Sequence, residues 1–196
     1  MKYFFLISFF LIFFSSLFSQ NVDINILKKI NLNRNKNLDE TYRTISNSIT
    51  PVSIGIPVGV LCAGFIKHDS TLKNKGMYIG ASLLVSAGIT TVLKFSINRP
   101  RPFVTYPVIE GSMHAGSPSF PSGHTSDAFA TATSLSIAFP KWYVVAPSFL
   151  WACSVGYSRM DLGVHYPSDV LAGAIIGAGS SYLCYKANRW IQKRRR

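Results

Sequence analysis

The chain has 196 residues, of which 48% are hydrophobic and only 14% charged, a composition that is unusual for a soluble globular domain. The formal net charge is +12, but the basic residues are dispersed in loops between apolar runs and in the terminal KRRR. This dispersion argues against a nucleic-acid-binding surface. A membrane protein with one main domain is the first expectation.

Residues 1–19 have the features of a secretory signal peptide. Lys2 precedes an apolar run over residues 3–14, and several serines follow. Cleavage after Ser19 would put Leu17 at the third position before the cut, where a small residue is more typical. An uncleaved first transmembrane helix is the alternative, because the run has the length and flanks that a membrane helix also needs.

Residues 20–48 are polar and basic, with Ile24, Leu27 and Ile30 at helical spacing. This pattern predicts an amphipathic segment outside the membrane, lying on its surface, and a solvated linker is the alternative. Asp39 is a plausible cap for a second short helix that leads into the next apolar run.

Five further segments are free or nearly free of charge, although several are shorter than the roughly 20 residues of a full membrane span. They are 49–66, 77–93, 125–139, 142–157 and 168–185. Buried helices of a soluble protein are a competing interpretation. Gly, Ala, Ser and Thr fill the polar positions, however, and these small residues allow close helix packing in lipid. We therefore predict an all-α, polytopic transmembrane bundle with five or six membrane helices.

Three short polar blocks lie at the edges of these apolar segments. They are KFSINRPRP (94–102), SPSFPSGHT (117–125) and YSRMDLGVHYPSD (157–169). Together they supply obligatory cations, histidines, a carboxylate and a Ser-Gly turn. This inventory suits the binding of a phosphoryl group and its transfer to a nitrogen nucleophile.

Written as patterns, the blocks read K-x6-R-P, P-S-G-H and S-R-x5-H-x3-D, in that order. In residue type, spacing and order they resemble the type 2 phosphatidic acid phosphatase (PAP2) superfamily. That superfamily includes bacterial membrane lipid phosphatases, soluble acid phosphatases and vanadium haloperoxidases. The resemblance predicts a phosphatase domain over residues 49–186 and leaves residues 187–196 as a basic cytoplasmic tail.

The resemblance implies a role for each matching residue. The phosphate-binding residues are Lys94, Arg101, Ser122, Gly123 and Arg159.

The catalytic residues that it implies are two histidines and an aspartate. His165 is the nucleophile and forms a phosphohistidine that water hydrolyses, while His124 is the general acid that protonates the departing alkoxide. Asp169 lies four residues after His165, so it could hold the imidazole N–H and fix its tautomer. Capping the last helix is the alternative role for Asp169.

Some residues in and near the blocks invite separate expectations. Gly123 should let the chain turn where other residues would be strained, so that its N–H and the Ser122 hydroxyl point at an anion. Arg99 matches no motif position and is expected to be a surface or headgroup cation. Asp161 and His114 match none either and receive no role.

No metal or cofactor is expected. The cysteines, Cys62, Cys153 and Cys184, lie in separate apolar segments, and no dense cluster of ligands surrounds any histidine. The positive charge that the chemistry needs would come from the phosphate-binding lysine and arginines.

The basic loops predict the orientation. Placing Lys67, Lys73, Lys75, Lys141 and the C-terminal tail in the cytoplasm satisfies the positive-inside tendency. The three polar blocks then face the periplasm from a bacterial inner membrane.

The expected function is a metal-independent membrane phosphatase that acts on a lipid phosphate monoester or diphosphate. Phosphatidate, phosphatidylglycerol phosphate, undecaprenyl diphosphate and the phosphates of lipid A all fit, and no nucleic-acid partner is expected. A vanadium haloperoxidase-like enzyme and a non-catalytic lipid-binding membrane protein are the alternatives.

Overall fold

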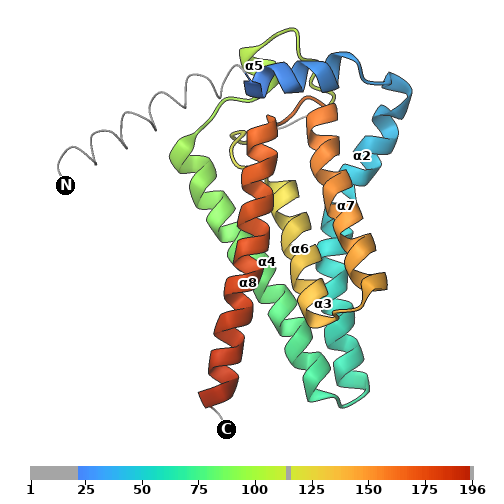
Figure 1. Cartoon of the computed structure of the whole chain (residues 1–196), viewed down its shortest axis with the longest axis vertical. Helices are drawn as coiled ribbons and strands as arrows, with labels where there is room; N and C mark the ends of the chain where they lie inside the picture. Colours follow the sequence, from blue (N-terminus) through green and yellow to red (C-terminus); the bar gives the residue numbers. More distant parts are fainter. Residues whose placement is uncertain (1–21, 114–115, 195–196) are drawn as a thin grey trace, which may run out of the picture.

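The computed structural model describes residues 22–113 and 116–194, and these residues form helices joined by short loops (Figure 1). A helical segment over residues 22–32 comes first. It is followed by η1 (Lys36–Leu38), α2 (Asp39–Asn47), α3 (Ile49–Ile66), α4 (Ser70–Ile97), α5 (Pro102–Thr105), α6 (Gly123–Ala138), α7 (Trp142–Asp161) and α8 (Pro167–Arg194). The predicted signal peptide or first helix over residues 1–19 lies outside the described residues.

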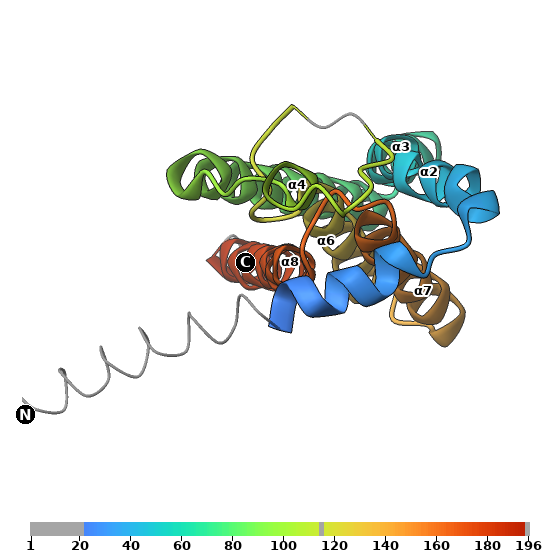
Figure 2. The same ribbon diagram turned by 90° about the horizontal axis from the view of Figure 1, so that it is seen from above.

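The long helices α3, α4, α6, α7 and α8 run along the longest dimension of the molecule, and α6 packs against all the others (Figures 1 and 2). The predicted all-α bundle is confirmed. Each of the five predicted apolar segments falls within one of these helices or extends past its end by a single residue. The predicted C-terminal tail is largely part of α8, which continues to Arg194.

Small residues fill the interior of the bundle, and large apolar residues cover its outside. Ala128, Ala130 and Ala132 of α6 are fully buried. Leu84 of α4 and Leu150 of α7, by contrast, are 76% and 70% exposed. A water-soluble bundle buries its large apolar side chains, so this distribution suits a bundle whose outer surface faces lipid.

Two glycines bring α8 against the first turns of α6. A Cβ atom at Gly173 would lie 2.6 Å from the carbonyl oxygen of Ser122, and one at Gly177 would lie 2.1 Å from that of Ser126. A side chain at either position would force the helices apart. This close approach places the beginning of α8, where the third polar block ends, beside the beginning of α6, where the second block ends.

Hydroxyl groups on neighbouring helices form hydrogen bonds with one another. The Ser126 hydroxyl on α6 lies 2.6 Å from that of Ser86 and accepts a hydrogen bond of 2.9 Å from Thr90, both on α4. Such pairs remove the cost of leaving hydroxyls unpaired in an apolar interior. These hydrogen bonds join α6 to α4. Thr90 lies one turn before Lys94, where the first block begins.

The helical segment 22–32 lies across one end of the bundle, over the ends of α7 and α8 (Figures 1 and 2). We call this the upper end, as in Figure 1. Asp23, Leu27 and Asn31 are buried beneath the segment. The Asn31 side chain donates to the carbonyl oxygen of Asp161 at 2.8 Å. The segment is therefore a packed part of the fold, and the alternative of a solvated linker is wrong.

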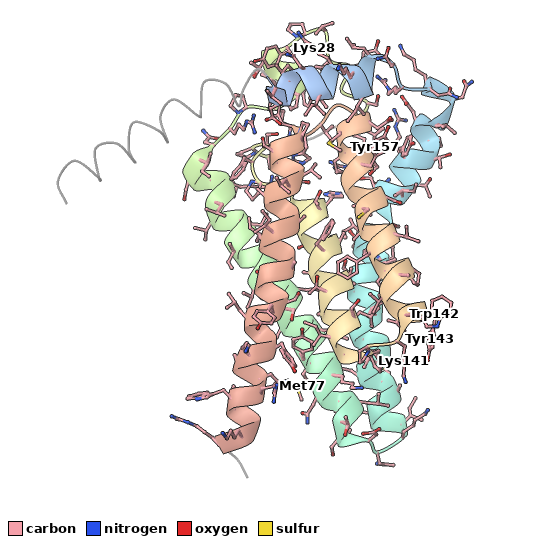
Figure 3. All side chains as sticks on the ribbon, in the orientation of Figure 1. Lys28, Met77, Lys141, Trp142, Tyr143 and Tyr157 are labelled. Carbon is pink, nitrogen blue, oxygen red and sulfur yellow. The ribbon has the colours of Figure 1, made fainter. Side chains whose placement is uncertain are left out.

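The opposite, lower end carries the α3–α4 turn, the α6–α7 turn and the C-terminus (Figure 1). Lys141, Trp142 and Tyr143 project together there, while Lys28 lies at the upper end (Figure 3). By length and hydropathy, two helical stretches in the described part of the chain are suited to cross a membrane, Lys36–Ile66 and Ser70–Thr105. The helices α6, α7 and α8 do not pass that test.

Candidate active site

The three polar blocks meet at the upper end of the bundle. The Ser122 N–H donates to the carbonyl oxygen of Asp169 at 3.0 Å, which joins the second block to the third. The guanidinium of Arg101 donates to the carbonyl oxygen of Val164 at 2.8 Å, which joins the first block to the third. Segments that are far apart in the chain therefore form one site.

Lys94 lies in the last turn of α4 and reaches over the second block. Its Nζ atom donates to the carbonyl oxygen of Pro118 at 2.7 Å. Its Cε atom is 3.8 Å from the position that a Cβ atom of Gly123 would take. The ammonium group thus lies close to the N-terminus of α6, where an anion is favoured.

Arg101 is the residue that precedes α5, and it is 7% exposed. Its Nε atom donates to the carbonyl oxygen of Ser117 at 2.8 Å. One terminal nitrogen lies 3.3 Å from Nε2 of His165. Two of its donors are fixed on backbone carbonyls, so the guanidinium is held in place beside the imidazole.

The position of Arg101 fixes the tautomer of His165. An arginine can only donate hydrogen bonds, so the Nε2 atom that faces it must carry a lone pair. The ring proton of neutral His165 is then on Nδ1, which lies 3.5 Å from Oδ2 of Asp169. Nε2 is therefore the atom available for attack on phosphorus.

Asp169 lies in the first turn of α8 and is fully buried. Its Oδ2 atom accepts hydrogen bonds from the Ser119 hydroxyl at 2.5 Å and from the Tyr166 N–H at 3.0 Å. The Ser119 hydroxyl is also 3.5 Å from Nδ1 of His165. Ser119 lies within the second block but was not identified from the sequence, because nothing in the pattern distinguishes it from its neighbours.

The chain turns tightly before His165. Gly163 has a φ of +71°, and a Cβ atom there would lie 2.4 Å from the carbonyl oxygen of Glu110. Only glycine fits this conformation and this space. The N–H groups of Val164 and His165 then donate to the carbonyl oxygen of Arg159 at 3.1 and 3.2 Å, which places His165 directly above the end of α7.

Burial lowers the pKa of His165 to about 3, since the ring is almost wholly removed from water. The hydrogen bond to Asp169 opposes this shift, and the nearby positive charges of Arg159 and Arg101 add to it. His165 is therefore neutral at physiological pH, which is the state that a nucleophile requires.

The second block begins α6 at Gly123, and one expectation for it is wrong. Gly163 is the only glycine in the described residues with a positive φ, so Gly123 has an ordinary backbone and no strain to relieve. The Ser122 hydroxyl is fully buried and lies 2.9 Å from that of Thr125, rather than pointing freely at an anion. The block supplies a helix N-terminus, which by itself favours an anion.

His124 follows in the first turn of α6. Lys94, Arg101 and Arg159 all act on its ring electrostatically. The ring is partly exposed, unlike that of His165. His124 thus lies at the open side of the cation cluster, as a group that protonates a departing alkoxide must.

Arg159 lies in the last turn of α7 and is 3% exposed. One terminal nitrogen donates a short hydrogen bond to the Ser46 hydroxyl and lies 3.4 Å from the sulfur of Met113. Its Nε–H has no partner in the described part of the chain, although it is buried. A buried donor of this kind is unfavourable unless an acceptor from a ligand completes it.

Lys94, Arg101 and Arg159 share one further property. Within residues 22–113 and 116–194, none of the three forms a salt bridge with a carboxylate. Buried charges in proteins are normally paired, because an isolated charge in an apolar site is costly. Three neighbouring cations without a counterion therefore form a site for a multiply charged anion.

The expectation that Arg99 is a surface or headgroup cation is wrong. Its guanidinium forms salt bridges with Asp169 at 2.7 Å and with Asp23 at 2.8 Å. Its position two residues before Arg101 was the only signal in the sequence. Asp23 lies outside all three blocks and carried no signal at all.

No three His, Cys, Asp or Glu side chains cluster as metal ligands among the described residues. The predicted independence of metal ions stays a prediction. His114 is outside the described residues.

Comparison with known proteins identifies the family. Residues 75–193, more than half of the chain, match the model of the PAP2 superfamily. The chain belongs to this superfamily. The resemblance inferred from the three blocks is thereby confirmed.

Individual phosphatases are similar to more than half of the chain. A lipid A 1-phosphatase from Rhizobium etli is 34% identical over 115 residues, which cover 55% of this chain and 48% of the relative. This chain thus spans about half the length of that relative. The undecaprenyl-diphosphatase BcrC from Bacillus subtilis is 28% identical over 138 residues, which cover 70% of each chain.

A solved structure of the superfamily has the same fold. It is a transmembrane PAP2-type phosphatidylglycerolphosphate phosphatase from Bacillus subtilis, which matches with a TM-score of 0.76 and 26% identity. The match covers 93% of this chain and 94% of the other. The bundle described here is thus the fold of a transmembrane PAP2 phosphatase.

Proposed function

We propose that this protein is a membrane phosphatase that hydrolyses a lipid phosphate monoester or diphosphate through a phosphohistidine intermediate. One observation carries the proposal. Three neighbouring cations, which have no carboxylate partner among the described residues, lie beside a neutral histidine whose Nε2 lone pair faces Arg101, one of those cations. Such a site binds a phosphoryl group and offers it a nitrogen nucleophile.

In the first step, Nε2 of His165 attacks phosphorus and forms the P–N bond. The P–O bond to the leaving group breaks, its electron pair goes to the leaving oxygen, and His124 protonates that oxygen. Lys94, Arg101 and Arg159 stabilise the negative charge on the phosphoryl oxygens. Nδ1 keeps its proton, and the positive charge that develops on the ring is stabilised by the carboxylate of Asp169.

In the second step, water attacks phosphorus on the side opposite to His165. His124, now neutral, accepts a proton from the water, and the P–N bond breaks to return His165 to its neutral form. Inorganic phosphate leaves the cation cluster. No step requires a group beyond these side chains and water.

A lipid substrate is supported by the outer surface of the bundle. Large apolar side chains cover its flanks, and the site lies at one end of the long helices, where a lipid headgroup would be at the same height. We propose that α3, α4, α6, α7 and α8 all cross the membrane. The short spans of α6 and α7 are compensated by their packing within the bundle.

The relatives suggest which headgroups to test. One is a lipid A 1-phosphatase, one an undecaprenyl-diphosphatase and one a phosphatidylglycerolphosphate phosphatase. These lipids all carry a phosphate on a hydrophobic anchor but differ in the group that bears it, and the cations contact only the phosphate in the mechanism above. The three lipids and phosphatidate are therefore equal candidates.

We propose that the site faces the periplasm from a bacterial inner membrane. The lower end, opposite to the site, carries the α3–α4 turn with Lys67, the beginning of α4 with Lys73 and Lys75, and Lys141 (Figures 1 and 3). A reporter fused after Arg196 should therefore be cytoplasmic, and one inserted near Gly111 should be external. The reverse result would place the site in the cytoplasm.

A phosphate-release assay tests the function. Purified protein in detergent is incubated with each of the four lipids in the presence of EDTA, and the His165→Ala variant is the control. Phosphate release from at least one lipid, absent in the control, is expected. No release from any of them, or release equal in the variant, would contradict the proposal.

A further inference from the structure

The contacts of Arg99 connect the catalytic aspartate to the N-terminal helical segment. One terminal nitrogen of Arg99 donates to Oδ1 of Asp169 at 2.7 Å, and the other donates to Oδ2 of Asp23 at 2.8 Å. The guanidinium also lies 3.8 Å from the centre of the Tyr166 ring. Two charged hydrogen bonds and an aromatic contact leave this side chain little freedom.

The two oxygens of Asp169 have different partners. Arg99 takes Oδ1, while Oδ2 accepts from Ser119 and from the Tyr166 N–H and faces Nδ1 of His165. The bond from Arg99 is the one that holds Oδ1. If it were lost, the bonds from Ser119 and Tyr166 would still hold Oδ2, but the carboxylate could rotate about that oxygen and change the angle at which Oδ2 meets the imidazole.

Asp23 binds both Arg99 and the N-terminus of α8. Its Oδ1 atom accepts from the Ser168 N–H at 2.8 Å, and its Oδ2 atom accepts from the Ser168 hydroxyl at 2.5 Å as well as from Arg99. Asp23 thus caps the N-terminus of α8, where Ser168 precedes Asp169.

The segment that carries Asp23 is itself fixed by packing. Ile24 and Leu27 are buried in one apolar cluster with Ile109 and Tyr166. Tyr166 is the neighbour of His165 in the chain. The helical segment 22–32 and the catalytic loop therefore share a core as well as an ion-pair network.

We propose that Arg99 and Asp23 are positioning residues for the His165–Asp169 pair, so that the N-terminal helical segment is part of the catalytic apparatus. This inference rests on the proposed phosphatase function. Neither residue contacts the phosphoryl group. They act through Asp169, whose orientation keeps the proton of His165 on Nδ1 and its lone pair on Nε2.

The test compares Arg99→Ala with a matched control, Arg34→Ala. Arg34 is also a buried arginine at the upper end that bridges two carboxylates, Asp39 and Glu110, each at 3.0 Å. It contacts no catalytic residue. Arg99→Ala should lower kcat by about 10- to 100-fold, because the loss of a side chain that supports a functional histidine typically has an effect of this size. KM should change by less than about threefold. Arg34→Ala should keep kcat within about twofold.

A double-mutant cycle separates positioning from general stabilisation. In an Asp169→Asn background, Arg99→Ala should lower kcat by less than about threefold further, because the carboxylate through which it acts is already gone. A further loss as large as in the wild-type background would overturn the proposal. So would equal losses of kcat in Arg99→Ala and Arg34→Ala.

Two conservative variants test the proposal in case Arg99→Ala does not fold. Asp23→Asn keeps the size of the side chain but removes its charge, and Arg99→Lys keeps the charge but cannot span both carboxylates. Both should lower kcat by about 3- to 10-fold in protein that elutes from size exclusion as the wild type does. Wild-type kcat in both variants would overturn the proposal.

A second readout does not depend on turnover, so it separates this inference from the proposed function. In protein labelled with ¹⁵N-histidine, the Nδ1 proton of His165 is assigned by its absence in His165→Ala. Its resonance should move in Arg99→Ala and stay in place in Arg34→Ala. An unchanged resonance in Arg99→Ala would refute the positioning role even if no phosphatase substrate were found.

Discussion

The upper end of the bundle contains two kinds of buried or partly buried cation. Arg34 and Arg99 each bridge two carboxylates, whereas Lys94, Arg101 and Arg159 form no salt bridge among the described residues. Both groups lie at the same end of the molecule. The paired arginines connect segments of the fold, and the unpaired cations leave their charge available to a ligand. The presence or absence of a carboxylate partner therefore distinguishes the cations that hold other side chains in place from those that bind the ligand.

The two histidines differ in a related way. His165 lies beside Asp169 and is 2% exposed, while His124 is partly exposed and has only cations as charged neighbours. The histidine with a carboxylate partner is held in one tautomer, which suits a nucleophile. The one without such a partner is free to exchange a proton with the substrate and with water.

The largest effect is expected for the histidine inside the cation cluster. His165→Ala should lower phosphate release by about 10³-fold or more, since no other side chain can accept the phosphoryl group. The exposed His68, at the lower end, is the control, and His68→Ala should retain full activity. Residual activity of His165→Ala above about 1% would exclude His165 as the nucleophile.

Replacing one cation from each group tests the comparison directly. Arg159→Met should lower kcat/KM by about 10²- to 10³-fold, as loss of one stabilising donor typically does. Its thermal stability without phosphate should stay equal or rise, because an unpaired buried charge is removed. Arg34→Ala should instead lose stability, by about 1–3 kcal/mol, and keep its activity.

Inorganic phosphate sharpens this test. It should raise the melting temperature of the wild type and of Arg34→Ala, because a ligand at 100 times its Kd stabilises by about 2.7 kcal/mol. It should raise that of Arg159→Met much less. Equal stabilisation of all three proteins would show that the unpaired cations are not the anion site.

The division between the histidines is tested with two leaving groups. His124→Ala should lower turnover by about 100-fold for a lipid phosphate, whose alkoxide must be protonated, and by less than about 10-fold for an activated aryl phosphate. Equal loss on both substrates would indicate that His124 shapes the phosphate pocket rather than donating a proton.

The smallest effect concerns stability and pH. The pKa of His165 is about 3 in the folded protein and near 6.5 when unfolded, so between these values only the unfolded chain binds the proton. Stability should therefore fall with decreasing pH below about 6.5, by about 1.4 kcal/mol per unit. In His165→Gln the free energy of unfolding should depend less on pH over this range, by about 1.4 kcal/mol per pH unit. Parallel slopes would mean that His165 takes up its proton over the same pH range in the folded and unfolded states, which would contradict the lowered pKa.

Much of the fold could be predicted from composition and periodicity. The apolar run 49–66 has the same bounds as α3, and Pro167 begins α8, because charge-free runs and proline positions are local properties of the chain. The boundaries of α4 and α8 were less accurate. The first turns of α4 and the last turns of both helices carry polar residues, which remain helical because each helix continues past its apolar region.

The candidate site was predictable where its residues belong to a spaced motif. Lys94, Arg101, Arg159 and His165 meet as the three blocks indicated. The reason given for Gly123 was wrong, since its backbone is unstrained and α6 simply begins there. A sequence pattern identifies a residue without identifying which physical property of it is used.

The sequence by itself determined the family, the helices and the cations, since these follow from residue types and short spacings. Only the tertiary structure decided which cations are paired. Arg99 lies 76 positions from Asp23 and 70 from Asp169, and no local pattern connects them. Whether a charged residue meets a partner depends on where distant segments are brought together by packing. Here the close contact of α6 with α8 and the position of segment 22–32 over α8 give Arg99 a carboxylate on each side. Arg159 meets none in the described part of the chain.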